Sequence, residues 1–258
     1  MPLLSRPPEL ALRGAAHAVR DKVSLRVAEG DRMFEGDAAH YLGCGASALN
    51  LLHAASGLAG LRPRRILDFG AGAGRVTRWL RAQWPRAQIF ATDLRAADLA
   101  FCEAEFGCST WISGTDVAAL AAPSRFDLIW AGSVLTHLDE ARALALLARL
   151  LEWTRPEGVV VASLHGRHAA GRGPASQFYG LGEAGWARLV GAFEAGEAYA
   201  YADYPFAAPG YGISLSRPDW TARLPERLPE TRLLLFGERV WDDHHDVVAL
   251  QRRAIDAA

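Results

Sequence analysis

The chain has 258 residues and half of them are hydrophobic, so it can bury the core of one α/β domain with an added element, whereas two equal domains are not expected. Its 28 basic residues are balanced by 29 acidic ones, which excludes a global positive field that would attract nucleic acid or an anionic membrane. The N-terminus has no uninterrupted apolar segment and no run reaches the length of a membrane span, which predicts a soluble, cytoplasmic protein.

Residues 1–62 are predicted to form an N-terminal arm and a lid helix. Apolar residues recur at helical spacing from Ala38 to Leu61, and Gly60 and Pro63 end this pattern. The stretch before it mixes proline, arginine and aspartate with short apolar pieces, so we expect an arm that lies outside the core.

The chain is organised around a short apolar run, Arg65–Phe69, which stops at three closely spaced glycines before a helical pattern begins. These glycines are Gly70, Gly72 and Gly74. Glycine adopts positive φ readily and lets bare backbone approach a ligand, and the N-terminus of the next helix adds its partial positive charge. We therefore predict a strand, a tight turn and a helix, with the backbone amides at positions 70–74 directed at a nucleotide-like ligand.

Two acidic residues flank this turn. Asp68 precedes the first glycine by two positions, and its negative charge suits a cationic amino-acid group better than a pyrophosphate. A second predicted strand, Gln88–Leu94, ends near Asp93, where an acid accepts hydrogen bonds from ribose hydroxyls. The G-x-G-x-G spacing also differs from the G-x-G-x-x-G of dinucleotide-binding folds.

Together these stretches resemble motif I of the class I S-adenosylmethionine-dependent methyltransferases, with Asp93 at the ribose-binding acidic position of that family. The resemblance extends to a bacterial subgroup described only by its methyltransferase domain. It implies S-adenosyl-L-methionine as cofactor and an α/β, Rossmann-like fold, in which a mostly parallel seven-stranded sheet ends in an antiparallel hairpin. The first cofactor-binding residues that it implies are Asp68, Phe69, Gly70, Ala71, Gly72, Gly74, Arg75, Asp93 and Leu94. A helix before the first strand helps to cover the cofactor in this family, so Tyr41 is a candidate ligand or substrate contact, with simple packing as the alternative.

The segment 63–165 is predicted to be the S-adenosylmethionine-binding core. Helices are expected at 96–106 and 140–153, strands at 109–113, 126–131 and 159–164, and a turn at 155–158. This alternation predicts a parallel sheet with right-handed crossovers and a ligand at the carboxyl ends of the strands.

Further cofactor contacts are implied by the family resemblance after strands three and four. Thr115 and Asp116 follow the third strand, where relatives place a polar residue near the adenine amino group; capping of a helix that begins at Val117 is the alternative role of Asp116. Gly132 and Ser133 follow the fourth strand and leave room for the methionine part of the cofactor.

Residues 166–229 are rich in glycine and aromatic residues and far exceed the usual connection in an α/β unit. Helices are expected near 183–193 and 218–223 and a strand at 211–215. An insert after strand five lies at the mouth of the sheet, so we predict a substrate cap. Most of its aromatic residues should form a satellite core, while Tyr179 and Tyr211 are the candidates for substrate contact. Residues 230–258 then form the closing hairpin, which a nicotinamide-dependent dehydrogenase would not need.

The chemistry implied by the resemblance is an in-line displacement on a sulfonium carbon, for which alignment alone can contribute about 7–11 kcal/mol. A base is optional, and His137 and His165 are the candidates, with shaping of the loop as the alternative role of His137. No metal site is predicted, because His165 and His168 lack ligand spacing and the adjacent His244 and His245 would point to opposite faces of a strand. A divalent ion remains the less favoured alternative. The remaining candidates for metal or redox chemistry, Cys44, Cys102 and Cys108, are interpreted as buried small hydrophobic residues.

The sequence therefore predicts a methyltransferase that acts on an oxygen or nitrogen atom of a small-molecule or glycan-like acceptor, without nucleic acid or a membrane as partner. The alternatives are an NAD(P)-dependent oxidoreductase and a catalytically silent binding protein with the same fold. The sequence does not indicate an oligomeric state.

Overall fold

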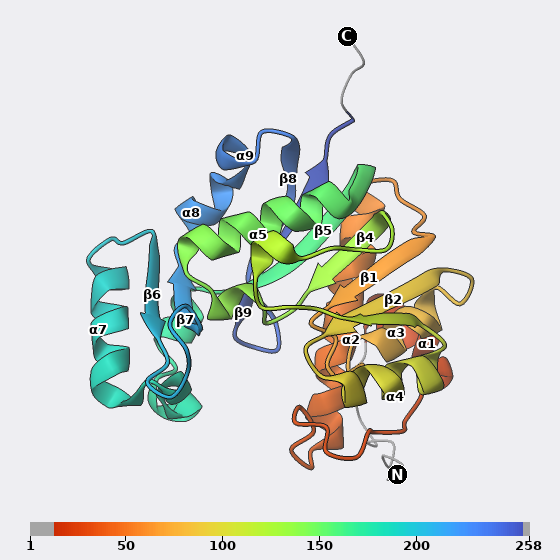
Figure 1. Ribbon diagram of the computed structural model, residues 1–258, viewed down its shortest axis with the longest axis horizontal. Coiled ribbons are helices and arrows are strands. Elements are labelled where there is room, and N and C mark those ends of the chain that lie inside the picture. Colours follow the sequence, from red (N-terminus) through yellow and green to blue (C-terminus); the bar gives the residue numbers. More distant parts are fainter. Residues whose placement is uncertain (1–12, 255–258) are drawn as a thin grey trace.

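The computed structural model describes residues 13–254, and its centre is a seven-stranded sheet (Figure 1). The strand order is β3-β2-β1-β4-β5-β9-β8, in which the first five strands are parallel and β9 is antiparallel to both of its neighbours. The strands are β1 Arg65–Phe69, β2 Gln88–Asp93, β3 Ser109–Ile112, β4 Phe126–Ala131, β5 Thr154–His165, β8 Thr231–Trp241 and β9 His245–Arg252. The predicted Rossmann-like class with a closing antiparallel hairpin is confirmed.

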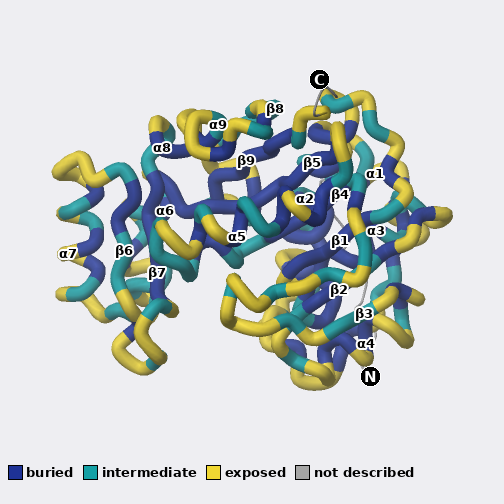
Figure 2. Tube along the Cα trace, turned by 45° about the horizontal axis from the view of Figure 1, so that its top comes forward, coloured by how far each residue is buried: buried dark blue, intermediate teal, exposed yellow. Residues whose placement is uncertain are grey.

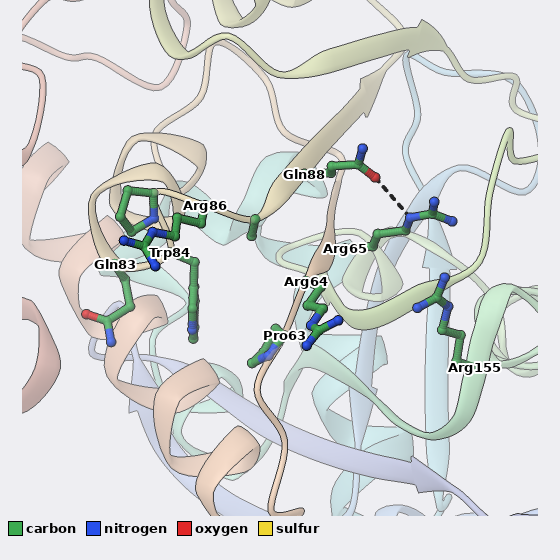
Figure 3. Close-up of a pocket in the computed structure, with 10 residues that line it drawn as sticks. Pro63, Arg64, Arg65, Gln83, Trp84, Arg86, Gln88 and Arg155 are labelled. Atoms are coloured by element: carbon green, nitrogen blue, oxygen red, sulfur yellow. Dashed lines mark hydrogen bonds between the residues drawn. The ribbon is translucent and has the colours of Figure 1, made fainter.

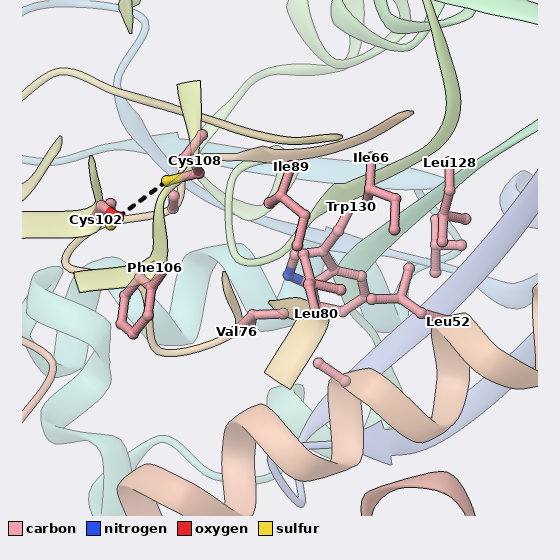
Figure 4. Packing of buried hydrophobic residues seen from close by; sticks show 14 of the residues in the cluster. Leu52, Ile66, Val76, Leu80, Ile89, Cys102, Phe106, Cys108, Leu128 and Trp130 are labelled. Atoms are coloured by element: carbon pink, nitrogen blue, oxygen red, sulfur yellow. Dashed lines mark hydrogen bonds between the residues drawn. The ribbon is translucent and has the colours of Figure 1, made fainter. Parts of the chain in front are cut away.

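Helices cover both faces of this sheet. Alternate residues of each strand point to opposite faces, so Ile66 of β1 packs toward α2, α3 and α4, whereas Leu67 packs toward α5. Figure 4 shows the first of these two cores, with Leu52 of α2 and Leu80 of α3 lying against strand residues. The helices around the sheet are α1 Gly14–Val19, α2 Ala38–Leu58, α3 Thr77–Gln83, α4 Ala96–Phe106 and α5 Glu140–Trp153, with short 3₁₀ turns at Arg20–Lys22, Val117–Ala119 and Leu135–His137.

The three cysteines are buried and free, as predicted. Cys102 and Cys108 belong to the α2-side core, and the Sγ atom of Cys102 lies 3.4 Å from the carbonyl oxygen of Gly72. They serve as small core residues under the glycine turn.

The insert after β5 forms a small subdomain at one end of the molecule (Figures 1 and 2). It contains α6 Arg167–Ala170, a 3₁₀ segment Pro174–Gly180, α7 Gly182–Glu194, β6 Tyr199–Asp203 and β7 Gly212–Ser216. Its two strands pair antiparallel, and Trp186, Leu189 and Phe193 of α7 pack against them in a separate hydrophobic cluster. This satellite core contains only half of the ten aromatic residues of the insert, because Tyr199 and Trp220 belong to the main core and three others belong to neither cluster.

The last part of the predicted insert joins the main core instead. Helices α8 Pro218–Ala222 and α9 Leu224–Arg227 bring Trp220 and Leu224 into the cluster formed by α5 and the sheet. The subdomain with its own core therefore ends near β7, before residue 229.

The expected turn at 155–158 is a bulge inside β5. Phe126 of β4 pairs with Thr154, but Leu128 already pairs with Val159, so four residues of β5 are looped out of the ladder. Glu157 takes a positive φ of 63° there, and Arg155 pairs with Asp127 at 3.3 Å. The turn signal was read correctly, but it bends a strand rather than starting one.

An open hollow of about 660 Å³ lies at the amino ends of β1 and β2 (Figure 3). Two of its arginines have side-chain partners, since Arg65 donates to Gln88 and Ser124 and Arg155 pairs with Asp127. It lies on the edge of the sheet opposite the carboxyl ends, where an α/β fold binds its ligand. None of the helices formed by residues 13–254 is long and apolar enough to cross a bilayer.

Candidate cofactor and acceptor site

The strand order places its switch point at the carboxyl ends of β1 and β4, where α/β folds bind their ligands in a crevice. The chain runs outward from β1 through β2 to β3 and then crosses back to β4, so the loops after β1 and β4 diverge. They still meet at one point, because a Cβ atom on Gly70 would lie 2.6 Å from Cγ2 of Val134. The structure thus brings together the two loops to which the sequence assigned cofactor contacts.

The glycine turn needs its glycines for two different reasons. Gly72 has φ +52° and faces open space, which leaves room for a ligand against the backbone. Gly74 has φ +82°, and a Cβ atom there would overlap the ring of Phe106 on α4. One glycine therefore permits ligand approach, and the other permits helix packing.

Four of the five amides of this turn have acceptors inside the protein. The N–H groups of Gly70 and Ala71 both donate to the carbonyl of Thr92, at 2.9 and 3.1 Å. Gly72 donates to the Asp93 carboxylate at 2.8 Å, and Gly74 donates to the carbonyl of Ala71. The prediction that the amides clasp the ligand is therefore wrong for these four, which hold the turn in place.

The Asp93 carboxylate can accept a further hydrogen bond from a ligand. Its Oδ1 accepts from the amides of Leu94 and Arg95 at 2.7 and 3.2 Å, and its Oδ2 accepts from Gly72. A carboxylate has about four lone-pair sites, and this one is only half-buried. A further hydrogen bond from a ribose hydroxyl therefore fits.

Asp68 is almost fully buried, with 1% of its surface exposed. Thr77, the first residue of α3, donates its hydroxyl to Oδ2 at 2.6 Å. Burial raises the pKa of Asp68 to about 7, against the opposing hydrogen bond from Thr77, and the nearby Asp93 raises it further. Asp68 thus holds the start of α3, and its contact with a cationic amino group stays a prediction.

Arg75 follows the glycine turn and carries a buried positive charge. Its guanidinium lies 5.9 Å from the centre of the Trp241 ring and is 9% exposed as a residue. Within residues 13–254 it has no hydrogen-bond acceptor or ion-pair partner. A free guanidinium beside the crevice suits a carboxylate, which it can bind with two parallel hydrogen bonds.

Two apolar side chains stand exposed beside Asp93. Leu94 is 56% exposed and Ile112, which pairs in register with Asp93, is 61% exposed. Thr115 and Asp116 follow in an exposed loop, where Asp116 accepts a hydrogen bond from the amide of Ala118 at 3.0 Å. The capping role of Asp116 is therefore confirmed. Leu94 and Ile112 provide two apolar surfaces beside Asp93 at the end of β2.

The loop after β4 is held in a strained conformation. Ser133 has φ +55°, and its amide donates to Oγ of Ser163 on β5 at 2.7 Å. At Gly132 a Cβ atom would lie 2.6 Å from the indole of Trp130. The loop is thus shaped by β5 and by its own strand.

His137 lies in the 3₁₀ turn after this loop and has a defined tautomer. Its Nδ1 atom is 3.1 Å from the carbonyl oxygen of Gly212 and 3.0 Å from the hydroxyl of Tyr204. Because a carbonyl only accepts, Nδ1 carries the proton and Nε2 keeps a lone pair. Burial lowers the pKa of His137, so the ring is neutral near pH 7.

The predicted tyrosines each lie against one of the predicted histidines. The ring of Tyr211 is 5.2 Å from that of His137, and the ring of Tyr179 is 4.9 Å from that of His165. His165 is only 3% exposed, whereas Tyr211 is 48% exposed. Two histidine–tyrosine pairs therefore join the carboxyl edge of the sheet to the subdomain.

His244 and His245 do not point to opposite faces as predicted. His244 belongs to the turn between β8 and β9, and only His245 is in the strand. Asp242 and Asp243 take positive φ in this turn, which brings the two imidazole rings to 4.1 Å from each other. His165 pairs in register with His245, and their rings are 4.6 Å apart.

Comparison with known proteins finds a family model that matches part of the chain. Residues 66–158 match the model described as "Methyltransferase domain". This part of the chain is therefore similar to a methyltransferase domain.

Solved structures share the fold of this chain. One is an S-adenosylmethionine-dependent methyltransferase from Clostridium acetobutylicum, which is 12% identical, with 81% of this chain and 92% of that chain covered and a TM-score of 0.54. Another is 1,6-didemethyltoxoflavin-N1-methyltransferase from Burkholderia thailandensis (19% identity, 82% and 79% covered, TM-score 0.57). A third is the N-methyltransferase NodS from Bradyrhizobium japonicum (12% identity, 93% and 99% covered, TM-score 0.53).

In the structure, some of the predicted site residues lie away from the site. Tyr41 is 1% exposed, and its hydroxyl donates to Asp31 at 2.6 Å while Arg78 donates to it at 3.1 Å. It packs in the core between α1 and α2 because this network satisfies its hydroxyl, so its predicted substrate contact is wrong. The ring of Phe69 packs against Trp153 of α5 and the side chain of Ala71 is buried, so these two can face the cofactor only through their backbone.

Other residues at the candidate site were not predicted from the sequence. Ile112 was assigned only to a strand, although an apolar residue at the end of an outer strand, level with the ribose-binding acid, is a usable signal. Tyr204 and Phe206 stack at 5.1 Å beside His137, with Phe206 73% exposed. No local pattern distinguishes these two from the aromatic residues of the satellite core.

Proposed function

We propose that this methyltransferase transfers the methyl group of S-adenosylmethionine to an oxygen or nitrogen atom of a small-molecule or glycan-like acceptor. The observation that carries the proposal is His137, which is neutral, partly exposed and held by Gly212 so that the lone pair of Nε2 is free. The subdomain supplies that carbonyl, so the base and the cap are positioned together.

The cofactor contacts follow from the crevice. Asp93 accepts hydrogen bonds from the ribose, and Leu94 and Ile112 pack on the adenine. Arg75 binds the carboxylate of the methionine part, because its guanidinium has no other acceptor among residues 13–254. Asp68 offers negative charge to the amino group from beneath the turn, and Gly72 leaves the space for this approach.

The acceptor is placed against His137. Tyr211 and Phe206 present exposed aromatic surface next to it, at 48% and 73% exposure. Such surfaces pack on a flat ring or on the apolar face of a sugar. The rigid loop at Ser133 and the cap then orient the acceptor atom, which is the main contribution that a protein makes to this reaction.

The acceptor loses a proton in this reaction, and His137 is placed to receive it. The cofactor, when bound, supplies a methyl group already activated on a sulfonium. The acceptor oxygen or nitrogen would form its new bond to the methyl carbon while the carbon–sulfur bond breaks, with its electron pair left on the sulfur of S-adenosylhomocysteine. The acceptor would give its proton to Nε2 of His137, which releases that proton to solvent. His165 is less suited to this role because it is 3% exposed.

A first prediction tests this function. With a panel of hydroxylated and aminated small molecules and sugars, formation of S-adenosylhomocysteine should identify an acceptor for the wild type. His137→Gln should then lower kcat by about 10²–10⁴-fold, because a positioned base contributes that much, while the affinity for S-adenosylhomocysteine stays unchanged.

His53→Gln is the matched control, since His53 is exposed on α2, and it should behave as the wild type. If His137→Gln turns over the acceptor at the wild-type rate, the base assignment is wrong. If the wild type binds the cofactor product but methylates nothing in the panel, the proposed acceptor class is wrong.

A further inference from the structure

Three histidines meet at the carboxyl edge of the sheet, outside the cofactor crevice. His165 ends β5, His245 begins β9, and His244 precedes it in the β8–β9 turn. Each offers one ring nitrogen, and the three nitrogen atoms lie within 4.8 Å of one another. The hairpin turn and the pairing of β5 with β9 create this cluster.

Two of these side chains have a buried nitrogen without a partner. Nδ1 of His165 and Nδ1 of His245 accept or donate no hydrogen bond within residues 13–254, and each side chain belongs to a residue that is 3% exposed. Buried polar atoms are normally satisfied, since an unpaired one loses its hydration without replacement. An electron-pair acceptor between the rings would satisfy both.

The third histidine is held as a metal ligand usually is. Nδ1 of His244 is 2.6 Å from the carbonyl oxygen of Asp242, so it must carry the proton and donate it. This leaves the lone pair on Nε2. A backbone carbonyl that holds the far nitrogen of an imidazole is the common outer contact of metal-binding histidines.

Packing between aromatic rings does not by itself explain the three-histidine cluster. The ring of Tyr179 lies 4.9 Å from that of His165, and the ring of Trp241 lies 4.7 Å from that of His245, so the cluster is enclosed by apolar surface. Packing explains these contacts but leaves the two Nδ1 atoms unpaired. Burial lowers the pKa of all three imidazoles and so favours the neutral form, which is the form that ligates.

The donor set favours one class of ion. Three imidazoles without a carboxylate suit zinc and its neighbours in the first transition row, whereas magnesium and calcium prefer oxygen ligands. Tetrahedral zinc bonded to nitrogen at about 2.0–2.1 Å holds its ligand atoms roughly 3.4 Å apart, so binding would draw the three rings together. Three protein ligands leave one position open.

We propose that His165, His244 and His245 bind one divalent transition-metal ion, zinc by preference. The fourth position suits an oxygen or nitrogen atom of the acceptor, a part of the inference that rests on the proposed function, whereas binding of the ion does not. The site explains why the predicted base His165 is buried beside two further histidines.

The test titrates cobalt(II) into untagged, chelator-treated protein and follows the visible absorption of the ion, with zinc as competitor. The wild type should bind one ion per chain, and zinc should displace it. His165→Gln, His244→Gln and His245→Gln should each weaken binding by more than about 100-fold, since even loss of an outer contact costs 10–100-fold. His53→Gln should bind as the wild type does.

Folding is monitored in the same samples through the rise in melting temperature that S-adenosylhomocysteine produces, which the variants should keep. Should the wild type bind cobalt no more tightly than the variant with all three histidines replaced, the site does not exist. Neither measurement uses an acceptor, so failure of the metal site and failure of the proposed methyl transfer are seen separately.

Discussion

Among single residues, Asp68 shows how burial changes the role that a motif assigns to a side chain. Its charge was expected to face the ligand, but its carboxylate lies beneath the glycine turn and receives the hydroxyl of Thr77. The pKa of about 7 that results places its titration near neutral pH. The same side chain therefore links the start of α3, the crevice and the pH dependence of stability.

The free energy of unfolding should depend on pH because of Asp68. Between its ordinary pKa near 3.8 and its folded pKa of about 7, the native state retains a proton that the unfolded chain has lost. Stability from this group is therefore complete below pH 3.8 and is lost as the pH rises through 7. Asp68→Asn keeps an acceptor for Thr77 without the charge, so it should flatten this fall.

Urea unfolding at about pH 5 and about pH 8 measures how much stability the wild type and Asp68→Asn each lose as the pH rises. We expect Asp68→Asn to gain stability relative to the wild type at the higher pH. Glu194→Gln, which removes an exposed carboxylate from α7, should leave the wild-type pH dependence in place. An unchanged slope in Asp68→Asn would contradict the assignment.

At the scale of elements, the structure is fixed by close approaches that glycine permits. The α3 and α4 helices pack where Gly74 adjoins Phe106 and Cys102. The lid helix α2 approaches the same region through Gly45, where a Cβ atom would meet the indole of Trp79. The glycine motif thus sets helix packing as well as the ligand crevice.

Gly74→Ala tests this packing role. It combines the strain of φ +82° with overlap between the new methyl group and the Phe106 ring, so we expect about 2–4 kcal/mol of destabilisation. Gly60→Ala is the matched control, because Gly60 has φ +65° but open space around its Cβ position. It should cost about 1 kcal/mol, from backbone strain alone. Equal losses in the two variants, measured by urea unfolding, would show that packing at Gly74 contributes nothing.

For the whole molecule, binding of the cofactor product between the two halves of the sheet should raise the free energy of unfolding. S-Adenosylhomocysteine at 100 times its Kd should add about 2.7 kcal/mol to the free energy of unfolding, which corresponds to a rise in Tm of roughly 5–10 °C for a chain of this size. NAD at the same concentration should leave Tm unchanged. A rise with NAD and none with S-adenosylhomocysteine would contradict the cofactor assignment.

The sequence by itself determined the features that depend on neighbouring residues. The apolar run into Gly70, the helix Ala96–Phe106 and the closing hairpin each follow from short-range patterns of burial and backbone freedom, and the structure has them. Asp93 at the end of β2 was also predictable, because strand length and the position of an acid are local properties. These patterns were sufficient to predict the fold class.

Only the tertiary structure decided which side chains meet. His165 and His245 are 80 positions apart, and they face each other because β9 pairs antiparallel with β5. Likewise, Tyr41 is withdrawn from the site by Asp31 and Arg78, and His137 receives its tautomer from Gly212. Such contacts depend on strand register and on competition between partners for a polar group, and neither quantity is encoded by spacing along the chain.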